Sequence, residues 1–258
     1  MAPTGFHGLL GLFLAGRIDR KQKYLRIGFV FGSVFPDLDL MGSVLFYIVS
    51  HNRDLAIGFH RSLTHSLFLI GVLILLIFIL KVYPNNRLLN HSIFIVGLTC
   101  GIFLHTLIDF FYFDGVSLLW PFQDFGERLY FFDFTYEDFP TAYNSLIAKL
   151  IGTFDGGFES IYFFIMANIA IKLQTDKEKK IHIFSKSFEI NSWPKLLKQI
   201  SYLTAITTVI FIILAFLSIN WTFLDRDSFI ILLYIPFTPI YLLSGLLPLF
   251  LTETISKY

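Results

Sequence analysis

The chain has 258 residues, of which 55% are hydrophobic, 18% aromatic and only 15% charged. This composition excludes an intrinsically disordered chain, a disulfide-linked framework and an ordinary soluble globule. The single cysteine, Cys100, excludes a cysteine-based metal site, and a net charge of +1 gives no basic footprint for nucleic acid. Charged residues lie between long apolar stretches, which is typical of a polytopic membrane protein.

Several apolar stretches are long enough to cross a bilayer, because a helix needs about 20 residues to cover about 30 Å. The stretch 27–50 has this length but carries Pro36 near its middle, whereas residues 5–16 are too short to cross comfortably. We therefore predict an all-α, polytopic membrane fold with about six or seven transmembrane segments. The other candidate spans are 63–82, 91–113, 157–173, 203–219 and 229–251.

Loop charge predicts an orientation in the membrane. Segments 17–26 and 172–198 each carry a net charge of +4, whereas the connection 114–156 carries −5. Lysine and arginine are retained on the cytoplasmic side, so both basic segments belong inside and the acidic connection outside. We expect an integral protein of the inner cell membrane. Its predicted parts are a membrane-embedded site region (1–122), an acidic, aromatic extracytoplasmic loop (123–156) and C-terminal scaffold helices (157–258).

Ionisable residues within or beside the predicted spans are the candidate functional residues, because each costs at least about 2.5–3.5 kcal/mol there. His105 and Asp109 lie four residues apart, hence on one helix face. Asp37 and Asp39 follow Pro36, where the helix must break. Each group also has an ordinary interpretation: a hydrogen-bonded pair for the first, and helix caps for the second.

The remaining candidates are His7, in the first apolar stretch, and the segment 60–66, at the outer mouth of a predicted span. Imidazole nitrogens and carboxylate oxygens without thiolates suit zinc, and also manganese or iron. We predict that the following residues converge on one divalent metal site: His7, Asp37, His65, His105 and Asp109. The predicted catalytic residues are Asp39, a further ligand or the general base; His60, which completes the shell; and Arg61, an anion clamp.

The order of these motifs is more specific than any one of them. They are Phe31 to Asp39 (FGSVFPDLD), His60 to Ser66 (HRSLTHS), and Gly101-x-x-x-His105-x-x-x-Asp109 with Gly115, Leu119 and Pro121. Over roughly residues 4–122 the set resembles the YdjM-like membrane-bound metal-dependent hydrolases. It departs from that pattern at Ser62, where the family has glycine, and at Tyr112, where the family has threonine.

The resemblance implies a hydrolase. The ligand order is also similar to that of zinc-dependent phospholipase C and related nucleases, in which zinc ions held on helices bind a phosphodiester. We therefore expect metal-assisted hydrolysis of a phosphoester, with a lipid or lipid-linked substrate because the site lies in the outer half of the bilayer. Two alternatives stay open: a transporter whose intramembrane His and Asp carry protons or a coupled cation, and a membrane scaffold with a structural metal.

Overall fold

The fold is described from a computed structural model of the chain, in which almost all of the regular structure is helical. It describes residues 4–52, 58–60, 62–82, 86–111, 116–122, 129, 141–175, 180–183, 186–189, 193–217, 239–240 and 242–246.

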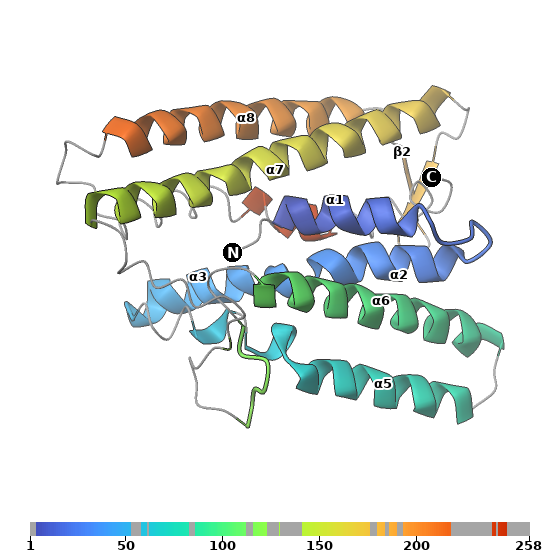
Figure 1. Cartoon of the computed structure of the whole chain (residues 1–258). Coiled ribbons are helices and arrows are strands. Elements are labelled where there is room, and N and C mark those ends of the chain that lie inside the picture. The colour runs from blue at the N-terminus through green and yellow to red at the C-terminus, as the bar shows by residue number, and fades with distance from the viewer. Residues whose placement is uncertain are drawn as a thin grey trace.

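The N-terminal part of the fold is a set of helices that lie side by side (Figure 1). Its elements in chain order are α1 (Thr4–Ala15), α2 (Lys23–Val34), the 3₁₀ turn η1 (Pro36–Leu38), α3 (Asp39–Ser50), the 3₁₀ turn η2 (Leu63–His65), α5 (Leu67–Val82) and α6 (Asn86–Phe111).

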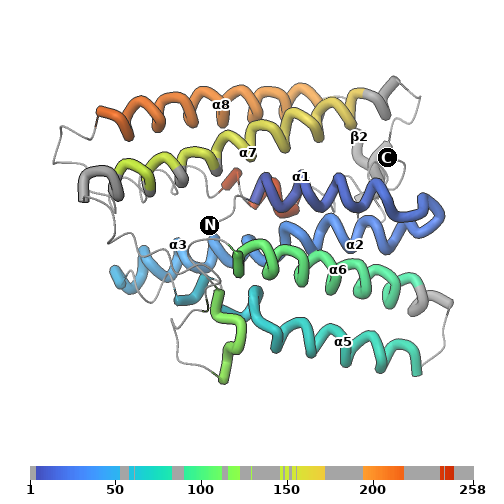
Figure 2. The backbone as a smooth tube through the Cα atoms, viewed as in Figure 1, coloured from blue at the N-terminus to red at the C-terminus, as the bar shows by residue number. Residues whose placement is uncertain are grey.

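The C-terminal part adds two long helices joined through a small antiparallel hairpin. Its elements are α7 (Thr141–Thr175), β1 (Lys180–Ile183), β2 (Lys186–Glu189) and α8 (Trp193–Leu217). Helix α1 contacts both α2 and α7, so it joins the two parts. The backbone tube shows α1 between these two helices (Figure 2).

Proline breaks the long apolar stretch where the sequence predicts. Pro36 stands at the start of η1, and the segments Lys23–Val34 and Pro36–Ser50 meet at an angle of 47°. A proline ring cannot continue a helix because it removes a backbone donor and clashes with the preceding turn. The bend carries Asp37 off the end of α2 and into the interior.

Two described helices are long and apolar enough to cross a membrane, Asn90–Phe111 and Pro194–Leu217, and the bent pair would make a third. The predicted spans 63–82 and 157–173 correspond to shorter apolar helices, Leu67–Val82 and Gly156–Ile171. The stretch 5–16, which we expect to be too short to cross comfortably, corresponds to Thr4–Ala15. At about 1.5 Å per residue, a 12-residue helix such as α1 reaches only about 18 Å. Most of the predicted span 229–251 lies outside the described residues.

Two boundaries differ from the prediction. The segment 123–156 is not a loop throughout, because α7 begins at Thr141. The last described span begins at Pro194 rather than at residue 203. In both cases the helix extends past its apolar window, so hydropathy marks where a helix is apolar but not where it starts.

Glycines allow α2 and α6 to touch along their backbones. A Cβ atom on Gly28 or Gly32 would overlap the carbonyl oxygens of Phe94 and Leu98, and one on Gly101 would overlap Phe29. Small residues spaced four apart are the usual means by which membrane helices approach closely. Residue numbers increase in the same direction along both helices, since Gly28 meets Phe94 and Gly32 meets Leu98. Helices α2 and α6 are therefore parallel, and their C-terminal ends lie at the same level.

Both basic connections lie at one end of the bundle. The turn between α1 and α2 and the link from α7 to α8 are on the same side of Figure 1, the right in that view. Helices α2 and α6 end towards the opposite side. This arrangement fits the predicted orientation, in which both basic segments face one compartment.

Candidate metal centre

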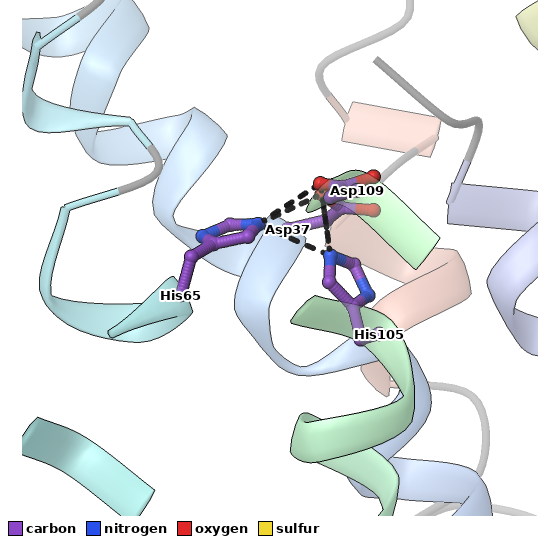
Figure 3. Close-up of side chains that lie close together, drawn as sticks. All are labelled: Asp37, His65, His105 and Asp109. Atoms are coloured by element: carbon purple, nitrogen blue, oxygen red, sulfur yellow. Dashed lines mark hydrogen bonds and ion pairs between the residues drawn. The ribbon is translucent and has the colours of Figure 1, made fainter. Parts of the chain in front are cut away.

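Four side chains from three separate elements meet in the interior. Asp37 comes from η1, His65 from η2, and His105 and Asp109 from neighbouring turns of α6 (Figure 3). Each side chain is buried, and the four nearest ligand atoms lie within 4.8 Å of one another. The parallel contact of α2 with α6 explains the convergence, because it delivers Asp37 to the level of the two α6 residues.

Five separations between these atoms are close to those of a tetrahedral metal site. His65 Nε2 lies 3.1 Å from His105 Nε2 and 3.4 Å from Asp109 Oδ2. His105 Nε2 lies 3.5 Å from Asp109 Oδ2 and 3.5 Å from Asp37 Oδ1, and the fifth separation, His65 Nε2 to Asp37 Oδ1, is 3.9 Å. Zinc ligands about 2.0–2.1 Å from the ion stand about 3.3–3.4 Å apart in a tetrahedron. Four of these five separations lie within about 0.3 Å of the tetrahedral value, and all four ligand atoms lie within 4.8 Å of one another, so the group could hold a metal ion such as zinc.

The outer nitrogens of both imidazoles are already bonded to the protein. His105 Nδ1 lies 2.8 Å from the backbone oxygen of Ser33, which only accepts, so this nitrogen carries a proton. His65 Nδ1 lies 3.0 Å from Thr64 Oγ1, and the Thr64 hydroxyl donates to Asp39. The Thr64 oxygen must then accept from His65. In the neutral imidazoles with Nδ1 protonated, both Nε2 atoms present lone pairs, which is the form in which imidazole binds a metal.

Asp39 and His60 form a pair beside the four-residue group. His60 Nδ1 lies 2.5 Å from Asp39 Oδ1, and the His60 ring packs edge-on against His65 at 5.5 Å. Asp39 Oδ2 lies 3.7 Å from His65 Nδ1, the side facing away from the ligand group. Asp39 is thus placed behind a ligand rather than among the ligands. Arg61 lies outside the described residues.

His7 lies next to the group, but its nitrogens do not join it. Its Nε2 is 3.2 Å from Asp109 Oδ1, and its ring stacks on His105 with centroids 3.7 Å apart. On the same helix, Thr4 Oγ1 donates to Asp37 Oδ2 at 2.7 Å. The structure therefore brings four of the five predicted ligands into one group and places His7 beside it.

The ordinary interpretations of these residues do not account for the geometry. The N-cap positions of η1 and α3 are Phe35 and Leu38, and neither makes a side-chain cap bond. Asp37 and Asp39 instead bond across the fold to threonines. His105 and Asp109 both face the other members of the group and do not contact only each other.

Three contributing groups were missing from the sequence interpretation: Thr4, Thr64 and the backbone oxygen of Ser33. A signal existed for Thr4, because it precedes His7 by three residues and so shares a helix face with it. Nothing in the sequence marks the carbonyl of Ser33, since every residue carries that acceptor.

Comparison with known protein families gives a match that covers this part of the chain. A family described as YdjM inner membrane protein matches residues 1–178, more than half of the chain. The chain belongs to the YdjM inner membrane protein family. The match includes all four residues of the buried group and most of α7, which extends the likeness beyond residue 122. Curated proteins and solved structures give no significant match.

Proposed function

We propose that this YdjM-family protein is a membrane-bound metal-dependent hydrolase that cleaves a phosphoester of a lipid or lipid-linked substrate. The observation that carries the proposal is the pair of Nε2 atoms of His65 and His105, which lie 3.1 Å apart beside two buried carboxylates. The lone pairs of two neutral imidazoles at this distance repel unless a proton or a metal ion lies between them, and two buried carboxylates supply the negative charge that compensates a metal ion. Asp37 and Asp109 provide these carboxylates.

Zinc is the metal we propose, because an N₂O₂ donor set of this size suits it, with manganese or iron as the other choices. A bound divalent ion supplies Lewis acidity towards the phosphoryl oxygen and lowers the pKa of a coordinated water. The residues that would hold it are Asp37, His65, His105 and Asp109.

The chain's own acid–base group is the Asp39–His60 pair. Asp39 Oδ1 accepts from His60 Nδ1 and so fixes the tautomer in which Nε2 is basic. We assign His60 as the proton acceptor for the attacking water and Asp39 as the residue that orients it. Arg61, which follows His60 directly, is the proposed clamp for the phosphate anion.

Apolar surface around the site supports a lipid substrate. Phe59 precedes His60 and is 37% exposed, while Leu63 and Leu67 flank His65 and are each 42% exposed. A soluble phosphoester would gain nothing from these side chains, whereas a lipid brings acyl chains to the same surface. With the predicted orientation, the site faces the extracytoplasmic side, where lipid headgroups are within reach.

The test is metal content together with phosphoester hydrolysis by protein purified in detergent. We expect bound zinc and turnover of phospholipid in mixed micelles for the wild type, and loss of both in His65→Ala and Asp109→Ala. His91→Ala is the matched control, since His91 is an exposed histidine on the same helix as Asp109. Zinc without turnover would instead identify a scaffold with a structural metal. Absence of metal, with pH-dependent ion flux in liposomes, would identify a transporter.

A further inference from the structure

Helix α1 carries two side chains that reach the proposed metal centre from the same face. Thr4 and His7 are three residues apart, so they lie one above the other on the helix. Thr4 bonds Asp37 Oδ2, and His7 bonds Asp109 Oδ1. In each contact the carboxylate uses the oxygen that faces away from the Nε2 atoms of His65 and His105.

We infer that α1 completes the metal centre by holding the outer oxygens of both carboxylates, and that His7 is a positioning residue rather than a ligand. The inference rests on the proposed metal site and deepens it. Asp37 is held with Oδ1 inward by Thr4, and Asp109 is held with Oδ2 inward by His7. Each carboxylate then offers one oxygen, which is what a four-coordinate site requires.

The position of the His7 ring opposes a ligand role. Its Nε2 is occupied by the bond to Asp109 Oδ1, the oxygen that does not face His65 and His105. Its ring lies nearly parallel to that of His105, at 21°, so the two imidazoles stack instead of converging on one point. Among the described residues, His7 Nδ1 has no hydrogen-bond partner, and the side chain is fully buried. The contacts that tie the ring to the centre are thus the bond to Asp109 and the stacking on His105.

The register of α1 is fixed along its whole length, as a positioning role requires. At its N-terminal end, a Cβ atom on Gly5 would lie 2.6 Å from the backbone of Phe158, and one on Gly8 would lie 2.6 Å from the Tyr162 ring. At its other end, Arg26 donates from Nε to the Ala15 carbonyl at 3.0 Å. A cation at a helix C-terminus is favourable because it meets the negative end of the helix dipole.

Glutamine and alanine at position 7 separate the two roles. The Nε2 amide of glutamine donates a hydrogen bond where the histidine Nε2 does, but it is a poor metal ligand. We expect His7→Ala to weaken zinc affinity about 10–100-fold, as removal of a residue behind a ligand does, and His7→Gln to restore most of that loss. Thr4→Val and Thr4→Ser form the parallel pair for Asp37.

The measurements are zinc competition against a chelator and the absorption spectrum of the cobalt-substituted protein. A positioning role predicts that the cobalt spectrum of His7→Gln keeps the wild-type shape, because the coordinating atoms are unchanged. A ligand role predicts that His7→Gln loses as much affinity as His7→Ala and that its spectrum changes, which would overturn the inference. If the wild type bound no metal, the proposed function itself would fail. Melting of the metal-free proteins in detergent identifies any variant that is merely misfolded, and His7→Gln leaves little cavity.

Discussion

The two parts of the molecule both bury polar side chains, but they satisfy them in different ways. Around the candidate metal centre, bonds join side chains that are far apart in sequence, such as His7 to Asp109. In the α7–α8 pair, hydroxyls bond mainly to backbone oxygens: Thr204 and Thr208 donate within their own helix. Ionisable groups cannot be satisfied by a local carbonyl alone, so burying them forces distant segments to meet.

The two parts also differ in how their helices contact each other. Helices α2 and α6 touch backbone to backbone through glycines. Helices α7 and α8 instead join a core of larger buried side chains, including Phe163, Met166 and Leu197. Backbone contact leaves little freedom in distance or register, whereas side chains can repack. Backbone contact between α2 and α6 therefore fixes the relative positions of the donor atoms, and the C-terminal part acts as support.

The largest effect that this comparison predicts comes from closing the glycine contact. Gly32→Leu would place a side chain where the Leu98 carbonyl lies, so we expect no folded protein to be recovered in detergent. Gly32→Ala, a smaller insertion, should destabilise the fold by about 1–3 kcal/mol, measured by thermal melting. Gly71→Leu on α5 is the control, because no described atom outside the local helix backbone lies within 4 Å of the added Cβ. Wild-type melting of Gly32→Leu would show that the backbone contact does not hold the two helices together.

A smaller effect is expected where a hydroxyl stands behind a ligand. Thr64→Val removes the link between His65 Nδ1 and Asp39, so zinc affinity should fall about 10–100-fold, and Thr64→Ser should restore it. Thr99→Val is the control: this threonine on α6 bonds only its own helix at Ile95 among the contacts described. Equal losses from Thr64→Val and Thr99→Val in a zinc competition assay would mean that the Thr64 hydroxyl has no special role.

The same contrast explains what the sequence could predict. Asp37, His65, His105 and Asp109 could be grouped in advance because each is expensive in an apolar span, and because two of them share a helix face. Family resemblance over these residues pointed to the same group, and the chain's membership confirms the family. The role of His7 could not be predicted, since it depends on the direction of α1 and on which ring nitrogen faces Asp109.

Helix boundaries were predictable only in part, for a physical reason. Hydropathy reports the apolar window of a helix, and both α7 and α8 begin in polar sequence before their windows. For α8 a signal was present, because Pro194 lies in its first turn, a position that proline favours. For α7 the start at Thr141 follows a segment rich in aromatic and acidic residues, which lacks the periodicity that marks a helix.

The smallest predicted effect lies in the supporting pair of helices. Ser160 and Ser201 exchange hydrogen bonds between α7 and α8, each hydroxyl donating to the other's backbone oxygen at 2.8 and 2.9 Å. Interhelical hydrogen bonds of this kind average about 0.6 kcal/mol in membrane proteins, so Ser201→Ala should lower the melting temperature slightly. Zinc affinity should not change, because the side-chain hydrogen bonds of both serines in the described part of the chain run between α7 and α8 only. A tenfold loss of zinc affinity in Ser201→Ala would show that α8 acts on the centre through α7 and α1, and that the C-terminal pair is more than a support.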